Sequence, residues 1–422
     1  MSRALRIDLV AVSSSPLAPL GGEDAGGQNA HVAALAAELG RQGCEVRVFT
    51  RRDGAHLPPS VELAPGVTVE HLPAGPPTPV RQDELFPHLP GFADHLARRW
   101  RADPPDLVHA HFWLSGWAAS QATAAGSAGS RSRVPLVQTF HGLGVVKARH
   151  RREADPSSPR RRPVETELMA EADHIVATCV AEAAELAALG ADRDKVTVVP
   201  GGVDHVTFRP VGARMRVPEP PGHRPRRYRL VVAGRLIPRK GIDDVVRALA
   251  ALPEAELVVA GGPSGTVAVD ADPEARRLLD IARQEDVADR VTFLGGLPRR
   301  MVPPLLRSAD VVVSTPWYEP FGAVPLEAMA CGVPVVATAV GGHLDTVQPE
   351  RTGLLVEPND PAAIATAVRR LLSNPSLRHR MGEEAVALAR ERFSWEQVAR
   401  STLDVYEQFT GAHDPGWWKV SA

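Results

Sequence analysis

Two carboxylates eight positions apart, Glu319 and Glu327, are the residues of this chain best placed to bind a polar ligand. They lie in the segment TPWYEPFGAVPLEAMACGVPVV, residues 315–336, which follows a short apolar run at 311–314. That run predicts a buried strand, and Pro325 suits the first turn of a helix, where its missing N–H costs nothing. We therefore expect a strand, a loop carrying Glu319, and a helix carrying Glu327 in its first turn.

Such an arrangement could bind a sugar nucleotide. A helix N-terminus after a parallel strand attracts anions, because its free N–H groups and its macrodipole point at one spot. A diphosphate could lie there while the carboxylates accept hydrogen bonds from sugar hydroxyls. The alternative is that both acids only complement the helix dipole. Either Glu alone fits that simpler interpretation, whereas the pair with its loop favours a ligand site.

A pair of cations, Arg235 and Lys240, forms a second candidate group in the segment GRLIPRKG. The segment follows a predicted strand at 228–233. Fixed cations there would stabilise the charge that develops on a leaving diphosphate, with Arg as a bidentate fork and Lys as a point charge. The alternative is an ordinary basic pair on the surface beside a helix.

The amino-terminal half carries two weaker signals. Gly26 and Gly27 stand at the start of a predicted helix, where the backbone could approach a phosphate, although turn chemistry alone explains many such pairs. His141 follows a predicted strand at 134–140 and precedes the basic loop 147–163. By itself His141 fits a structural histidine, and a charge run of this kind is usually solvated.

Strands alternate with helices along most of the chain, which indicates an α/β fold with parallel sheets. We expect two doubly wound, Rossmann-like domains facing each other across a cleft. The Pro-, Gly- and Arg-rich stretch 211–227 predicts the boundary. The first domain is then 1–210, joined by the C-terminal helix and tail 395–422, and the second is 211–394. Stretch 51–105 is Pro-rich and is assigned no regular element.

The individual elements follow from hydrophobic periodicity. A helix after Gly27 has one apolar face formed by Val32, Leu35, Ala36 and Leu39. The predicted strands are 5–12, 44–50, 107–111, 134–140, 174–178, 196–199, 228–233, 256–260, 291–294, 311–314 and 333–338. The other predicted helices are 165–172, 242–252, 273–285, 362–372 and 395–409.

Composition describes an ordinary soluble protein. The 422 residues are 44% hydrophobic and 23% charged, and the net charge of −2 does not indicate a nucleic-acid partner. Three separated cysteines form neither a disulfide framework nor a zinc motif, and they suit a reducing cytoplasm. No apolar run has the length of a membrane span. The oligomeric state, a homodimer included, is left open.

The segment EPFGAVPLE followed by AMACGVPVVAT resembles the signature of retaining glycosyltransferases of family 4. GRLIPRKG, PGGVDHVTFRP, FLGGLP and TFHGLG are similar to further motifs of that family, and the resemblance spans residues 7–409. It implies a GT-B fold, a nucleotide-sugar donor (UDP-linked by default) and retention of configuration. No cofactor is required by it; a divalent metal is possible but not evident, since cationic side chains and helix N-termini can take its role.

The resemblance also implies roles for single residues. Glu327 would bind the ribose hydroxyls, Glu319 the hydroxyls of the donor sugar, and Gly27 the diphosphate. The leaving phosphate would take the acceptor proton, so Glu319 is not assigned as a nucleophile. The implied catalytic set is Glu319, Arg235, Lys240 and His141, and the donor-binding set is Gly26, Gly27, Leu297, Gly322, Val324 and Glu327.

Among family members, the beginning of the chain and HFWLSGW resemble enzymes that glycosylate inositol phosphate, with sucrose-phosphate synthases next. Three positions depart from that pattern: Ser13 replaces a histidine, Phe112 a tyrosine and Gly142 a threonine. Each lost group could have contacted the phosphate of the acceptor, and one charge-assisted hydrogen bond contributes about 1.5–3 kcal/mol. The acceptor-side residues expected are Ser13, Arg81, Phe112, Gly142, Lys147 and Arg161.

These departures predict a different acceptor, a small cyclitol, aminocyclitol or sugar. The alternatives are an inositol 3-phosphate glycosyltransferase or an enzyme similar to sucrose-phosphate synthase. Two further alternatives are a nucleotide-sugar 2-epimerase on the same scaffold and a non-catalytic nucleotide-sugar-binding module. The segment EPFGAVPLE speaks against the epimerase, and the intact Glu319, Glu327, Arg235 and Lys240 speak against the binding module.

Overall fold

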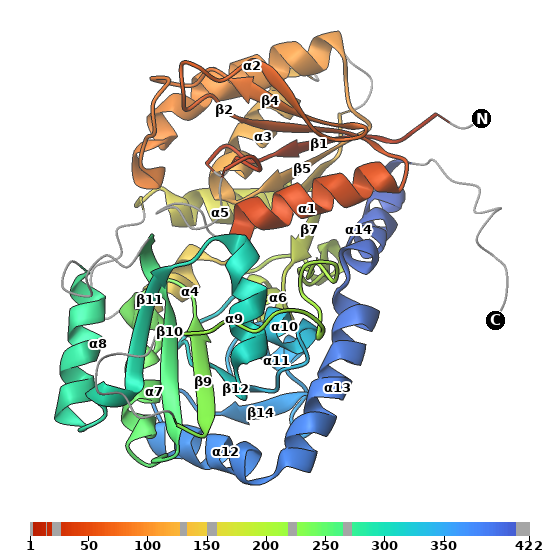
Figure 1. Ribbon diagram of the computed structural model, residues 1–422. Helices are drawn as coiled ribbons and strands as arrows, with labels where there is room; N and C mark the ends of the chain where they lie inside the picture. Colours follow the sequence, from red (N-terminus) through yellow and green to blue (C-terminus); the bar gives the residue numbers. More distant parts are fainter. Residues whose placement is uncertain are drawn as a thin grey trace, which may run out of the picture.

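The chain forms two sheets of mostly parallel strands, one in the upper half and one in the lower half of Figure 1. The computed structural model describes residues 3–13, 15–18, 27–126, 133–149, 158–217, 226–264 and 272–410. Gly26 and the tail 411–422 lie outside the described residues. Each sheet has helices packed on it and its own hydrophobic core, so the predicted pair of Rossmann-like α/β domains is confirmed.

The amino-terminal sheet has eight strands in the order β3-β4-β2-β1-β5-β6-β7-β8. All neighbours are parallel except β3, which runs antiparallel to β4 at the edge. The central strands are buried nearly throughout, as expected of a sheet covered on both faces. Their bounds are β1 Arg6–Val10, β2 Glu45–Arg51, β3 Ser60–Ala64, β4 Val67–Leu72, β5 Leu107–His111, β6 Leu136–Thr139, β7 His174–Ala177 and β8 Val196–Val198.

Helices of this domain are α1 Gly27–Arg41, α2 Leu89–Ala102, α3 Trp113–Gly126, α4 Gly144–Arg149, α5 Arg161–Glu171 and α6 Val180–Ala188. The predicted apolar face of α1 is buried as expected. The assignment of 51–105 as irregular was wrong, because β3, β4 and α2 lie in it. Pro90 occupies the start of α2, where proline is tolerated, and Phe92, Leu96 and Trp100 line its buried face at helical spacing.

The carboxyl-terminal sheet is parallel throughout and has the order β11-β10-β9-β12-β13-β14. The strand order reverses between β9 and β12, so a crevice is expected at the carboxyl ends of these two strands. Both candidate groups, the cations after β9 and the carboxylates after β12, follow those ends. The bounds are β9 Tyr228–Ala233, β10 Ala255–Ser264, β11 Val291–Gly296, β12 Val311–Ser314, β13 Val335–Thr338 and β14 Gly353–Val356.

Helices of this domain are α7 Ile242–Leu249, α8 Pro273–Gln284, α9 Val302–Ser308, α10 Ala323–Ala330, α11 His343–Thr346 and α12 Pro361–Ser373. One expectation needs correction: α10 begins at Ala323, so Glu327 comes just after its first turn. Pro325 is in that first turn as predicted. The cause is Gly322, which caps the helix with a φ of 84° and starts it earlier than the position of Pro325 suggests.

Two long helices connect the domains along one side of the molecule (Figure 1). Helix α13, Pro375–Phe393, packs on the second domain, and α14, Trp395–Thr410, crosses to the first and lies against α1. The crossing point is tied to the first connection, since the Val203 N–H donates to the Phe393 carbonyl at 2.8 Å. The two chain crossings, at 203–210 and just before Trp395, therefore lie side by side.

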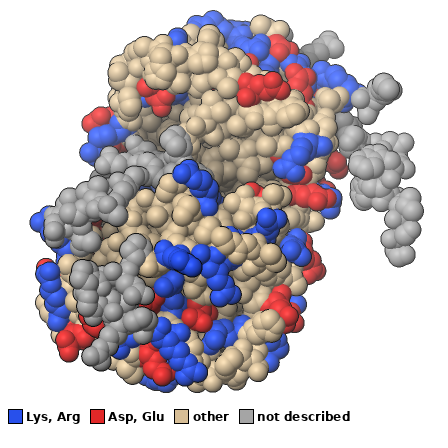
Figure 2. Space-filling view, viewed as in Figure 1, with Lys and Arg blue, Asp and Glu red and all other residues tan. Residues whose placement is uncertain are grey.

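On the face shown in Figure 2, Lys and Arg side chains gather over the lower domain, with Asp and Glu side chains among them. Among the helices of the described residues, none combines the length and apolar character needed to cross a membrane.

Candidate active site

The loop after β12 docks on the loop after β9, and this contact builds the site. The Thr315 hydroxyl donates to the Gly241 carbonyl at 2.8 Å, and the Trp317 N–H donates to the Arg239 carbonyl at 3.0 Å. A Cβ at position 241 would lie 2.1 Å from the Thr315 carbonyl oxygen, and φ there is +60°. Only glycine fits such an approach, so the docking of the two loops requires Gly241.

This docking brings the predicted Lys240 and Glu319 together. Lys240 Nζ lies 2.6 Å from Glu319 Oε2, and the two side chains are 19% and 13% exposed. Burial alone would raise the pKa of Glu319, but the charges of Lys240, Arg239 and His343 outweigh it and hold that pKa at about 2. Glu319 is therefore ionised at every physiological pH, and its partner cation is fixed in place.

Glu327 has a cation of its own. Arg299 Nη2 lies 2.5 Å from Glu327 Oε1, and the Arg299 guanidinium also covers the Phe208 ring at 4.4 Å. Burial raises the pKa of Glu327, and Arg299 acts in the opposite direction. The sequence analysis missed Arg299, although it follows FLGGLP, the loop expected to contact the base. That proximity in sequence was the available signal.

The remaining donor-side residues surround these two ion pairs. Leu297 and Val324 are partly buried and pack against the same apolar cluster beneath α10. The Gly322 N–H donates to Glu319 Oε1 at 3.4 Å. Arg235 follows β9 directly and is exposed. The second domain thus presents its predicted cations and carboxylates at one end of its sheet.

In the first domain, His141 follows β6 and has a left-handed backbone with φ 55°. Its Nε2 lies 3.0 Å from Nδ1 of His111, at the end of β5. Gln28, in the first turn of α1, donates to the His111 carbonyl at 3.2 Å. Gly27 is therefore at the same edge of the sheet, and among the described residues no atom beyond its chain neighbours and its own helix backbone lies within 4 Å of where its Cβ would be.

The two sides meet at the loops that carry the predicted catalytic residues. A Cβ at Gly142 would lie 2.7 Å from the Tyr318 hydroxyl, and the Thr178 hydroxyl donates to the Pro320 carbonyl at 3.4 Å. Close by, the Val180 N–H donates to Asp345 Oδ2 at 2.7 Å. The segments containing His141, Glu319 and Lys240 thus converge between the domains, which is the geometry that the motifs require.

Some of the predicted acceptor-side residues are buried in contacts within the protein. Arg161 is 3% exposed, and its guanidinium donates to Glu165 and to the Gly142 carbonyl, each at 2.6 Å. Its Cζ lies 4.9 Å from the Phe112 ring, which Lys147 Nζ approaches at 5.8 Å. Arg161 therefore stabilises the His141–Gly142 loop through these contacts.

Two other acceptor-side residues lie at the outer part of the first domain. Gln82 donates to the Ser13 hydroxyl at 3.3 Å. The neighbouring Arg81 is exposed and pairs with Asp83 at 3.2 Å.

Metal-binding geometry is not seen in the described residues, where no group of three His, Cys, Asp or Glu side chains is arranged to bind an ion. Two Asp-x-Asp triplets occur in the sequence, beginning at Asp192 and Asp270. Asp192 accepts from the Asp194 N–H, and Asp272 accepts from two N–H groups at the start of α8. Asp270 lies outside the described residues.

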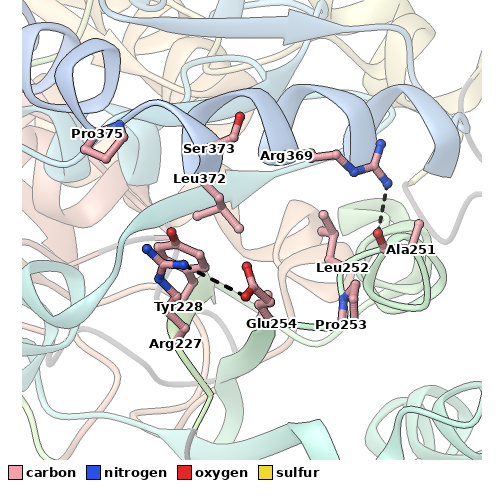
Figure 3. Close-up of a pocket in the computed structure, with 11 residues that line it drawn as sticks. Arg227, Tyr228, Ala251, Leu252, Pro253, Glu254, Arg369, Leu372, Ser373 and Pro375 are labelled. Atoms are coloured by element: carbon pink, nitrogen blue, oxygen red, sulfur yellow. Dashed lines mark hydrogen bonds and ion pairs between the residues drawn. The ribbon is translucent and has the colours of Figure 1, made fainter.

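A cavity of about 600 Å³ lies at the amino ends of β9 and β10, away from the cleft (Figure 3). Its charged side chains are engaged at its rim: Arg369 donates to the Ala251 carbonyl at 2.9 Å, and Arg227 lies 3.9 Å from Glu254. The cavity therefore belongs to the opposite edge of the sheet and takes no part in the site.

Comparison with known proteins decides the family. Residues 25–206 match Glycosyltransferase Family 4, and residues 215–387 match Glycosyl transferases group 1. The D-inositol 3-phosphate glycosyltransferase of Acidothermus cellulolyticus is 39% identical over 417 residues, covering 95% of this chain and 90% of the relative. This chain belongs to glycosyltransferase family 4.

Solved structures agree with that membership. Sucrose-phosphate synthase from Thermosynechococcus elongatus superposes with a TM-score of 0.84 at 33% identity, covering 97% of this glycosyltransferase and all of that chain. HepE of Anabaena, solved in complex with UDP-glucose, has a TM-score of 0.69 at 20% identity and shows the shared fold alone. The predicted GT-B fold and glycosyltransferase activity are confirmed.

Replacing Arg299 with Ala tests its pairing with Glu327. We expect the donor KM to rise roughly 10-fold or more, as for loss of one charge-assisted interaction. The acidic limb of kcat/KM for the donor should also move to higher pH, because the pKa of Glu327 loses the cation that opposes burial. Arg300→Ala, one position along, is the matched control. An unchanged pH profile in Arg299→Ala would contradict the pairing.

Replacing Lys240 separates two roles of its charge. Lys240→Ala should lower kcat by about 10²-fold, with a smaller effect on donor affinity, if the ammonium stabilises charge developing on the leaving group. Lys240→Gln keeps a donor for Glu319 without the charge and should lose kcat similarly. Steady-state kinetics and donor binding by calorimetry measure both quantities. Wild-type kcat in Lys240→Gln would show that Lys240 only orients Glu319.

Proposed function

We propose that this glycosyltransferase moves a hexosyl unit from a UDP-linked sugar to a small hydroxylated acceptor without a phosphate, with retention of configuration. Such an acceptor is a cyclitol, an aminocyclitol or a sugar. The observation that carries the proposal is the pair of cation–carboxylate contacts, Lys240–Glu319 and Arg299–Glu327, near the reversal of strand order. The loop that carries Glu319 packs against the His141–Gly142 loop. Each carboxylate is held in one orientation and can accept from sugar hydroxyls.

The donor would lie across these contacts. Glu327 is placed to accept hydrogen bonds from ribose hydroxyls, and Glu319 from hydroxyls of the transferred sugar. Arg235 and Lys240 would offset the charge of the diphosphate, with Gly27 and the start of α1 approaching it from the first domain. A UDP-sugar is the donor that the family resemblance implies, and HepE, which has the same fold, was solved in complex with UDP-glucose.

Transfer on one face of the sugar follows from the state of Glu319. A carboxylate with a pKa of about 2, bonded to Lys240, is a weak base and a restrained nucleophile. We therefore assign the acceptor proton to the leaving diphosphate. The bond from the anomeric carbon to the phosphate oxygen breaks, the bond to the acceptor oxygen forms on the same face, and the acceptor proton goes to that phosphate oxygen.

The absence of a phosphate on the acceptor is supported by the first domain. Phe112 and Gly142 bring no hydroxyl, and the Tyr318 hydroxyl occupies space beside Gly142. Arg161 is buried in contacts with Glu165 and Gly142. An inositol 3-phosphate acceptor is the second candidate, favoured by relatives of that name at 39% identity.

An acceptor panel tests the two candidates. Purified enzyme is incubated with UDP-glucose or UDP-N-acetylglucosamine and with inositol, inositol 3-phosphate, aminocyclitols, glucose or fructose 6-phosphate, and UDP release is followed. We expect kcat/KM for the preferred unphosphorylated acceptor to exceed that for inositol 3-phosphate by about 10-fold or more. This factor corresponds to the loss of one charge-assisted contact with the phosphate. Proton NMR of the product reads the anomeric configuration.

The same panel contains its own controls. Robust turnover of inositol 3-phosphate would overturn the acceptor proposal and leave the glycosyltransferase assignment intact. Donor incubated without acceptor distinguishes the remaining classes: epimerised donor would indicate a 2-epimerase, and saturable binding of unchanged donor with no transfer to any acceptor a binding module.

We also propose that no metal cofactor is required, because Arg235 and Lys240 supply positive charge where the diphosphate would lie. The rate of UDP release is expected to be the same in EDTA as in buffer with added Mg²⁺ or Mn²⁺. Loss of the rate in EDTA with recovery on adding either ion would contradict this.

A further inference from the structure

Four imidazoles lie together beneath the cleft in the first domain. His31 comes from α1, His109 and His111 from β5, and His141 from the loop after β6. The ring centroids of His31 and His141 are 5.1 Å apart, those of His109 and His111 4.2 Å, and those of His111 and His141 5.2 Å. His111 is 0% exposed. The TFHGLG motif gives a role to His141 alone, and the purpose of the other rings needs an explanation.

The hydrogen bonds of these rings are unequal. His109 is satisfied at both nitrogens, by the Tyr406 hydroxyl at 2.6 Å and the Thr139 hydroxyl at 2.8 Å. His111 uses Nδ1 toward His141 Nε2 at 3.0 Å, but its Nε2 is buried without a hydrogen-bond partner in the described part of the chain. Nδ1 of His141 has no partner there either, yet it is not among the atoms shut off from solvent.

Both rings are neutral, since burial lowers the pKa of His111 and of His141 well below the usual value. A neutral imidazole has one donor nitrogen and one acceptor nitrogen. Among the described residues, the titratable groups that affect the pKa of these rings are neighbouring histidines, whose protonated forms would disfavour a further positive charge. The single proton in the His111–His141 contact can therefore be arranged in two ways.

The buried Nε2 of His111 distinguishes between these two arrangements of the proton. If His141 donates, the proton of His111 is on Nε2, which leaves a buried N–H without an acceptor. If His111 donates through Nδ1–H, its Nε2 carries only a lone pair, and the proton of His141 is on Nδ1, at the cleft, where water or ligand can accept it. Orphaned buried N–H groups are the rarer and costlier case.

We propose that His111 is a positioning residue that donates to Nε2 of His141 and thereby holds His141 as a hydrogen-bond donor, through Nδ1–H, to a sugar oxygen in the cleft. This deepens the proposed function and rests on it. His141 then has no free lone pair to accept the acceptor's proton, so it cannot act as the general base. The proton must go elsewhere, to the leaving diphosphate.

The surroundings of the two rings fix this arrangement. Left-handed backbone occurs at His141 and at Phe112, directly after His111, with φ of 55° and 77°. The Phe112 N–H donates to the Thr139 carbonyl at 2.7 Å, so the ends of β5 and β6 are tied together. His31 packs edge-on against His141 and against Trp395, at 5.1 and 5.3 Å. Non-glycine residues adopt such backbone only when surrounding structure imposes it.

The test uses ¹⁵N-histidine NMR of the whole enzyme together with an isosteric pair of variants. In wild type, His141, identified by its loss in His141→Asn, should show the proton on Nδ1. His111→Asn keeps an N–H donor and should preserve that tautomer and kcat. His111→Asp presents an acceptor to His141 and should therefore move the proton of His141 from Nδ1 to Nε2. We expect kcat to fall by about 10²-fold, because one hydrogen-bond donor to the transition state is lost. His174→Asn, a buried histidine outside the cleft, controls for loss of a ring.

The outcomes separate clearly. A wild-type His141 protonated on Nε2 overturns the proposal, and this measurement needs neither turnover nor a folded His111 variant. Equal tautomers and equal kcat in folded His111→Asn and His111→Asp also overturn it. If no acceptor is glycosylated by wild type, the proposed function fails while the tautomer result still stands by itself.

Discussion

The docking of the loop after β12 on the loop after β9 is the contact on which the site depends. It places an ammonium against a carboxylate in a space that is mostly closed to water. Separating such a pair leaves a charge without its partner where solvation is poor, which is strongly unfavourable. The Lys240–Glu319 contact is therefore fixed by the fold before a ligand arrives. Gly241 makes this possible, because any side chain there would collide with the Thr315 carbonyl.

The two domains contribute different chemistry to one cleft. The second domain presents ionised groups in matched pairs, each carboxylate with a cation beside it. The first presents neutral imidazoles, whose pKa values are lowered by burial and by one another. A charged donor and an uncharged acceptor would suit this division. Contacts of Tyr318 and Pro320 with the Gly142 loop join the two domains.

Secondary structure was predictable where hydrophobic periodicity is strong, as in α1 and the core strands. The prediction of secondary structure failed where charged residues or prolines obscure the hydrophobic pattern. Helix α2 was missed because Pro90 and the surrounding Pro-rich stretch indicate irregular structure, although proline merely starts the helix. Helix α13 was missed because charged residues occur along most of its length, and only a few positions, such as Leu377 and Met381, are buried.

The amino-acid sequence by itself determined the family, the parallel α/β architecture and the positions of Glu319, Glu327, Arg235 and Lys240. These depend on local spacing: glycines, prolines and charges at set distances from a strand end. Only the tertiary structure decided that Arg299 pairs with Glu327, that Arg161 is buried against Glu165, and that His111 contacts His141. Burial and long-range pairing set these side chains' charge and direction, and both arise only when segments distant in sequence are packed together.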